Sequence, residues 1–160
     1  MRCGYCYAGE KTFEAMNETV MEQSIDFVCT QVELRQANKL VLSFLGGEPL
    51  MEKKKLFYIQ DEFKKRLGNK VKIIAQLSTN GLLLTDNLMR ELTERSMMVS
   101  LSLDGTPETM QRQRPTIKNT DYSKQIDRAI QSVLKHNPFT NAFCVITPQS
   151  AKNAFENITW

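Results

Sequence analysis

Apolar segments that suit β-strands alternate with segments of helical periodicity along most of the chain, and this alternation limits the fold more than any other feature. Strands are predicted at 39–45, 71–78, 97–103 and 140–147, where short apolar runs end in turn-forming residues. A segment of helical spacing follows each of them. Strands that alternate with helices pair in parallel through right-handed crossovers, so the sequence predicts an α/β domain. The spacing does not distinguish an open sheet from a barrel.

The helices are predicted from apolar residues that recur every three or four positions. One of them precedes the first strand, and Thr85 offers a side chain that can cap another. Pro107 is expected only to open a short turn. The helical patterns lie at 18–36, 56–67, 86–92, 126–134 and 151–158.

Composition and charge exclude several classes of protein. The chain has 160 residues, which suits a single domain, and its net charge of +3 is too small for a nucleic-acid-binding surface. No apolar run reaches the roughly 20 residues that a membrane-spanning helix needs. The cysteines do not form the framework of a secreted disulfide protein. We therefore expect a cytoplasmic protein with reduced thiols, in which Cys29 and Cys144 are buried packing residues.

Residues that suit ligand binding stand where each of three predicted strands ends. The first strand is followed by Gly46-Gly47-Glu48-Pro49, the second by Ser78-Thr79-Asn80-Gly81, and the third carries Ser102 before Asp104-Gly105. Each segment alone is typical of a turn, and Asn80 and Asp104 are interpreted as turn residues. Parallel α/β folds place ligand sites at the carboxyl ends of their strands. The combination therefore predicts a binding site at this edge of the sheet.

The segment Cys3-Gly4-Tyr5-Cys6-Tyr7 is the sharpest local motif. A Cys-x-x-Cys pair can be half of a zinc site, a thioredoxin-like redox pair or part of an iron–sulfur site. A zinc site needs further ligands at matching spacing, and the other cysteines stand alone. A thioredoxin motif follows a strand, and no strand precedes this motif in the chain.

These segments, in this order and spacing, resemble the radical S-adenosylmethionine (radical SAM) superfamily. The resemblance extends from Arg2 to about Thr147 and is carried by Cys-Gly-Tyr-Cys-Tyr, Gly-Gly-Glu-Pro, Ser-Thr-Asn-Gly and Ser-Leu-Asp-Gly. Within the superfamily the chain is similar to peptide and protein maturases of the SPASM type, such as anaerobic sulfatase-maturating enzymes. The resemblance implies an incomplete parallel (β/α)6 partial TIM-type barrel that lacks the first strand and the sixth β/α unit.

The cysteine motif of the family, Cys-x-x-x-Cys-x-x-Cys, is matched only in part. Cys3 and Cys6 match its second and third cysteines, and the first would lie four residues before Cys3, ahead of Met1. We therefore expect residues 1–160 to be a partial radical SAM core domain. It would be truncated N-terminally inside this motif and C-terminally before any auxiliary-cluster domain.

The resemblance implies a 4Fe-4S cluster and S-adenosyl-L-methionine as cofactors, with Cys3 and Cys6 as metal ligands. An electron from the cluster would cleave S-adenosylmethionine, and the resulting 5′-deoxyadenosyl radical would abstract a hydrogen from a peptide or protein. The implied partners are this substrate and an external electron donor of the flavodoxin or ferredoxin type, without nucleic acid or membrane. An inactive or non-catalytic fragment and a zinc or redox Cys-x-x-Cys module remain alternatives. The sequence identifies no catalytic acid or base.

The resemblance also assigns residues to S-adenosylmethionine. Gly46 and Gly47 lack a Cβ and would let the backbone approach the ligand closely. Glu48 would accept a hydrogen bond from the ammonium group, and the guanidinium of Arg114 suits a carboxylate. The predicted cofactor-binding residues are Tyr5 near the adenine, Gly46, Gly47 and Glu48 near the methionine part, and Ser102 and Arg114 near the ribose or the carboxylate.

Overall fold

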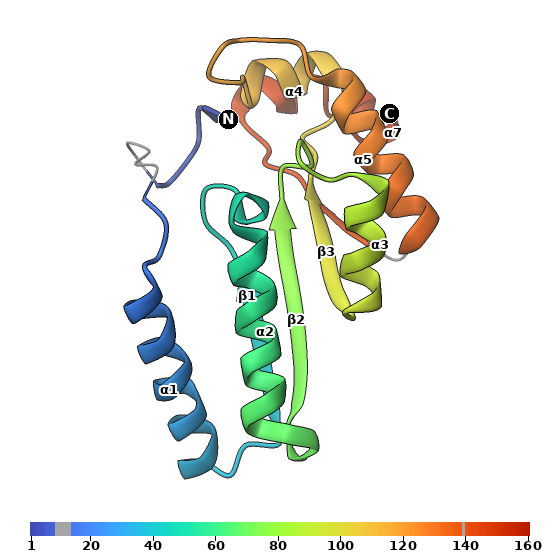
Figure 1. The fold of residues 1–160 in the computed structure, drawn as a ribbon. Coiled ribbons are helices and arrows are strands. Elements are labelled where there is room, and N and C mark those ends of the chain that lie inside the picture. Colours follow the sequence, from blue (N-terminus) through green and yellow to red (C-terminus); the bar gives the residue numbers. More distant parts are fainter. Residues whose placement is uncertain (9–13, 139) are drawn as a thin grey trace.

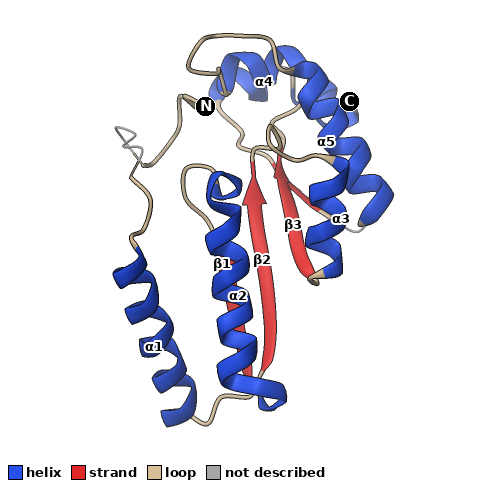
Figure 2. Cartoon of the chain, viewed as in Figure 1, coloured by secondary structure: helices blue, strands red, loops and turns tan. Residues whose placement is uncertain are grey.

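A parallel β-sheet with helices packed against it forms the body of the chain (Figures 1 and 2). The computed structural model describes residues 1–8, 14–138 and 140–160. Within these residues the sheet has four strands in the order β1-β2-β3-β4, and every neighbouring pair is parallel. The predicted α/β class with a parallel sheet is confirmed. The strands are β1 (Lys39–Phe44), β2 (Lys72–Thr79), β3 (Met97–Ser102) and β4 (Asn141–Phe143).

The helices are α1 (Glu18–Leu34), α2 (Lys53–Leu67), α3 (Asp86–Glu94), α4 (Pro107–Gln113), α5 (Ser123–His136), α6 (Pro148–Ala151) and α7 (Ala154–Thr159). Helices α1, α3, α4 and α6 begin where a side chain accepts a hydrogen bond from an amide group of the first turn. The side chain of Asn17 accepts a hydrogen bond from the amide of Val20, and Thr85 does the same for Leu88. Short 3-10 turns, η1 (Pro49–Glu52) and η2 (Gly68–Lys70), flank the second helix.

The segment after Pro107 is a helix rather than the short turn expected from the sequence. Pro107 occupies the start of the seven-residue helix α4, where a missing amide proton costs nothing. The side chain of Thr106 accepts a hydrogen bond from the amide of Thr109. Thr106 and Pro107 together form a helix-start signal that the sequence prediction did not use.

The C-terminal part of the chain also differs from the prediction. Strand β4 has three residues instead of 140–147, because the amide of Val145 donates to the side chain of Asp104 at 3.0 Å and not to the sheet. The helix expected at 151–158 is divided into α6 and α7. Its first part starts earlier because Thr147 and Ser150 form a capping box.

The strands bury one face of the sheet against the helices. Ala75 and Leu77 of β2 alternate with less buried neighbours and join Met89 and Leu92 of α3 in the main core. Met98, on the other face, is 49% exposed. The alternation fits a sheet covered by helices on one side. The parallel pairing of the strands places their carboxyl ends together at one edge. None of the helices in the described ranges is long and apolar enough to cross a membrane.

Candidate functional site

The two cysteines of the N-terminal motif lie on one tight turn. The amide of Cys6 donates to the carbonyl oxygen of Cys3 at 3.2 Å, which closes the turn. Both cysteines are free and partly exposed. The amide of Gly4 donates to the carbonyl of Gln113 at 3.1 Å, and that of Arg2 donates to the carbonyl of Pro115 at 2.7 Å. The turn is therefore fixed against the C-terminal end of α4.

A buried ion pair lies beside this turn. The carboxylate of Asp104 is fully buried, and Arg114, 7% exposed, donates to it through Nε at 2.7 Å and Nη2 at 2.8 Å. The hydroxyl of Tyr5 donates to the same carboxylate. Burial opposes the charged form of Asp104, but the hydrogen bonds from Arg114 and Tyr5 outweigh it and hold the pKa of the carboxyl below its ordinary value. Asp104 is therefore a charged acceptor in the folded chain.

The side chain of Tyr5 is suited to its role as a donor. Its pKa is raised far above the ordinary value by burial first and then by the hydrogen bond to Asp104. The Cζ atom of Arg114 lies 5.3 Å from the centre of the Tyr5 ring, which is within the range of a cation–π contact. The phenol consequently stays protonated. Arg114 contacts its ring, and Asp104 accepts a hydrogen bond from its hydroxyl.

Glu48 connects the carboxyl ends of β1 and β2. Its Oε1 accepts hydrogen bonds from the amide of Leu50 at 3.1 Å and from the hydroxyl of Thr79 at 2.7 Å. Its Oε2 accepts from the amide of Asn80 at 2.8 Å. The carboxylate therefore fixes the Gly-Gly-Glu-Pro loop to the Ser-Thr-Asn-Gly loop, as parallel strands that end at one edge allow.

The two glycines before Glu48 border open space. A Cβ built on Gly46 or Gly47 would meet no other atom within 4 Å, and Gly46 has a φ of +143° that a side chain disfavours. The space beside the backbone is therefore open here, and the binding of a ligand to it stays a prediction.

The predicted site residues fall at the carboxyl edge of the sheet, but their contacts differ from the expected ones. The fork of Arg114 is engaged by Asp104, a residue of the chain itself. Arg112, two residues before it, is exposed. Ser102 ends β3 and pairs with Phe143 in the sheet. Their roles towards a ligand stay predictions.

Sequence reasoning missed the importance of Asp104, which it treated as a turn residue. Its partner Arg114 lies ten residues further on, across a helix whose existence was not predicted. A strand-end aspartate followed by a helix and an arginine was the available signal. The prediction that Cys144 is buried is wrong, because β4 ends before it and leaves it exposed. Cys29 is partly buried and packs against the core shared by α1 and α2.

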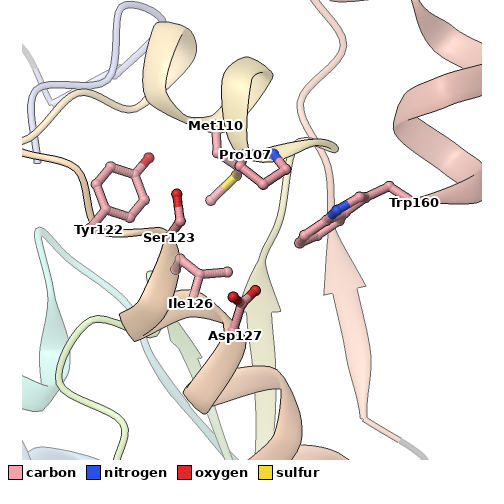
Figure 3. Close-up of a pocket in the computed structure, with 7 residues that line it drawn as sticks. All are labelled: Pro107, Met110, Tyr122, Ser123, Ile126, Asp127 and Trp160. Carbon is pink, nitrogen blue, oxygen red and sulfur yellow. The ribbon is translucent and has the colours of Figure 1, made fainter.

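The cavity in Figure 3 is too small to be a substrate site. It lies among Met110, Tyr122, Ile126 and Trp160 and has a volume of about 10 Å³, which is room for one water molecule. We interpret it as imperfect packing between α4, α5 and the C-terminal residue.

A family model described as the radical SAM superfamily matches residues 1–158 of this chain. The chain belongs to that superfamily. A cysteine-type anaerobic sulfatase-maturating enzyme of Clostridium perfringens (strain 13 / Type A) is 26% identical over 161 residues, which covers 96% of this chain and 42% of the relative. A serine-type anaerobic sulfatase-maturating enzyme of Bacteroides thetaiotaomicron is 25% identical over 159 residues. That match covers 95% of this chain and 38% of the relative.

Solved structures of radical SAM proteins share the fold. One described as native anSMEcpe with bound AdoMet and Cp18Cys peptide superposes with a TM-score of 0.86 at 25% identity. The match covers 99% of this chain and 43% of that one. The fold is thus that of the radical SAM partial TIM barrel, and the chain spans about two fifths of the length of the relatives it matches.

The superfamily implies a 4Fe-4S cluster and S-adenosylmethionine, and the residues fit them in part. Thiolates are the ligands that iron–sulfur clusters require, and Cys3 and Cys6 supply two of them from one turn. The described residues contain no group of three or more metal-ligating side chains close enough to hold an ion. The open flank of Gly46 and Gly47 fits a ligand that approaches the backbone.

Proposed function

We propose that this protein uses the radical SAM reaction to modify a peptide or protein. The supporting observation is the cysteine turn, which is fixed at the carboxyl edge of the sheet where the Gly-Gly-Glu-Pro loop also ends. When bound, the cluster and S-adenosylmethionine supply a 5′-deoxyadenosyl radical that abstracts a hydrogen atom from the substrate. The sulfatase-maturating relatives favour a protein substrate.

In this proposal Cys3 and Cys6 ligate iron, and the loop of Gly46, Gly47 and Glu48 receives the methionine part of S-adenosylmethionine. A carboxylate has about four acceptor positions. Glu48 uses three of them within the chain, so Oε2 retains one for the ammonium group. Glu48 can thus bind the ligand without giving up the contacts that shape its loop.

The wider assignments are also proposals. We propose that residues 1–160 are a partial radical SAM core domain, which agrees with the share of its relatives that the chain covers. The sheet of the described residues has β1 and β4 as open edges, where further strands of a barrel can pair. An external electron donor of the flavodoxin or ferredoxin type completes the reaction.

The alternative, a chain that does not hold a cluster, is favoured by a single observation. Only two cysteine ligands for a cluster are brought together among the described residues, whereas the motif of the family has three. A zinc or redox module would also use this pair. The experiment must therefore separate iron, zinc and no metal.

The test uses the product of the natural gene, purified and reconstituted without oxygen with iron and sulfide. After reduction and addition of S-adenosylmethionine, we expect 5′-deoxyadenosine to form. Cys3→Ala and Cys6→Ala should abolish it, whereas Cys144→Ala, an exposed cysteine outside the turn, should not. An iron-loaded sample that forms no 5′-deoxyadenosine would contradict the proposal. One equivalent of tightly bound zinc without iron would establish the zinc module instead.

A further inference from the structure

Asp104 joins segments that are far apart in the sequence through one buried carboxylate. Its Oδ1 accepts hydrogen bonds from Nη2 of Arg114 at 2.8 Å and from the amide of Val145 at 3.0 Å. Its Oδ2 accepts from Nε of Arg114 at 2.7 Å and from the hydroxyl of Tyr5. These bonds fill the roughly four acceptor positions of a carboxylate. Asp104 therefore has no acceptor left for a ligand, in contrast to Glu48.

Arg114 is held by the chain itself, through both its side chain and its backbone. Nε and Nη2 donate side by side from one edge of its guanidinium, and both bonds go to Asp104. The carbonyl oxygen of Arg114 accepts the hydroxyl of Tyr122 at 2.9 Å, which holds the backbone as well. A ligand carboxylate at this edge would have to displace Asp104 and leave it buried without its cation, which is strongly unfavourable.

The cysteine turn is hydrogen-bonded to this pair and to the residues beside it. Tyr5 stands between Cys3 and Cys6 in the sequence, so the hydroxyl that binds Asp104 belongs to the turn itself. The backbone bonds of Arg2 and Gly4 reach Pro115 and Gln113, the neighbours of Arg114. All of these attachments converge on the loop that Asp104 and Arg114 hold.

We propose that Asp104 and Arg114 are positioning residues, which fix the thiols of Cys3 and Cys6 through the hydroxyl of Tyr5. The inference rests on the proposed function, because the position of these thiols matters for chemistry only if they ligate a cluster. It assigns the Nε–Nη2 edge of Arg114 to the chain's own carboxylate in place of the carboxylate of S-adenosylmethionine. It makes Tyr5 the connection between the metal ligands and the sheet.

The first arm of the test needs no metal. Tyr5→Phe removes only the hydroxyl and leaves Asp104 paired with Arg114. Tyr7→Phe is the matched control, because it makes the same change in the same segment at a side chain that is 89% exposed. In metal-free protein we expect Tyr5→Phe to speed hydrogen exchange of the amides of Arg2 and Gly4 about tenfold, which corresponds to about 1.4 kcal/mol. Tyr7→Phe should leave it unchanged.

The second arm measures the cluster directly. In reconstituted protein we expect Tyr5→Phe to lose iron to a chelator at least severalfold faster than the wild type, with Tyr7→Phe like the wild type. An altered electron paramagnetic resonance spectrum of the reduced cluster in Tyr5→Phe alone would show that the thiols have moved. A wild-type protein that takes up no iron would refute the proposed function. The hydrogen-exchange comparison would still decide whether the bond from Tyr5 to Asp104 holds the cysteine turn in place.

A double-variant comparison tests whether Tyr5 acts through Asp104. If Asp104→Asn folds, adding Tyr5→Phe to it should speed exchange less than Tyr5→Phe does in the wild type, since the shared bond is already weakened. If the variant does not fold, the comparison of Tyr5→Phe with Tyr7→Phe stands alone. Equal exchange and equal iron loss in these two variants would overturn the proposal.

Discussion

Gly105 is a position where a single methyl group should loosen the C-terminal helix from the sheet. Its φ is +123°, and a Cβ there would lie 2.2 Å from Oδ1 and 2.4 Å from Cβ of Asn157. Oδ1 of Asn157 accepts the amide of Thr106 at 3.2 Å, and its Nδ2 donates to the carbonyl of Ser150 at 3.1 Å. Gly105→Ala must therefore displace Asn157 and break both hydrogen bonds.

The size of the effect follows from these contacts. Each lost hydrogen bond contributes about 0.5–1.5 kcal/mol, and a side chain in a disfavoured backbone region costs about 1–3 kcal/mol. We therefore expect Gly105→Ala to lower the free energy of unfolding by about 2–6 kcal/mol. The strain and the lost bonds are separate contributions, so a second substitution can distinguish them.

Urea denaturation followed by circular dichroism measures the loss. Gly47→Ala is the matched control, because a Cβ there meets no atom within 4 Å, and its cost should stay near about 0.5 kcal/mol. An Asn157→Gly background removes the three atoms nearest to the added methyl group, so the cost of Gly105→Ala should fall towards the backbone strain of about 1–3 kcal/mol. An equal cost in both backgrounds would refute the assigned clash.

Three further predictions concern the site and the core. Glu48→Ala removes an acceptor used by three donors and should lower the free energy of unfolding by about 1–3 kcal/mol; an unchanged urea midpoint would contradict its role in connecting the strand ends. Because the folded-state pKa of Asp104 is lowered, its contribution to stability is complete above the ordinary pKa of about 3.9 and is lost as the pH falls through the folded value. Tyr5→Phe removes one bond that lowers this pKa, so acid unfolding followed by circular dichroism should begin at a higher pH than in the wild type, and a shift to lower pH would count against the bond. Met89→Ala, at a side chain with 0% exposure, should cost about 2–5 kcal/mol in urea, whereas Met51→Ala, 64% exposed, should cost no more than about 0.5 kcal/mol; similar losses would show that the core is misassigned.

The parallel sheet was predictable because its cause is local in the sequence. Apolar runs such as that of β2 alternate with helical patterns such as that of α2, and this order alone selects parallel pairing. The Gly-Gly-Glu-Pro loop was also recognisable, since its residues are adjacent and its glycines and proline have distinct backbone properties. These features do not depend on which distant segments meet.

The features that escaped prediction depend on distant contacts. The short β4 results from Val145 binding a side chain across the edge of the sheet, and no pattern within 140–147 contains that information. The pairing of Asp104 with Arg114 likewise depends on how α4 turns the chain back. Two helix starts were available locally and were overlooked: Thr106 followed by Pro107 at α4, and the capping box of Thr147 and Ser150 at α6.

The attachment of Tyr5 to Asp104 has a consequence for biosynthesis. The partners are 99 positions apart, so at translation rates of about 5–20 residues per second the thiols wait about 5–20 s before the carboxylate that places them is made. During that interval the nascent cysteines have no fixed orientation, and metal delivered then would meet an unformed site. Under the proposed function, the two thiols would therefore hold a cluster in their final geometry only after the chain has been made as far as Asp104 and has folded.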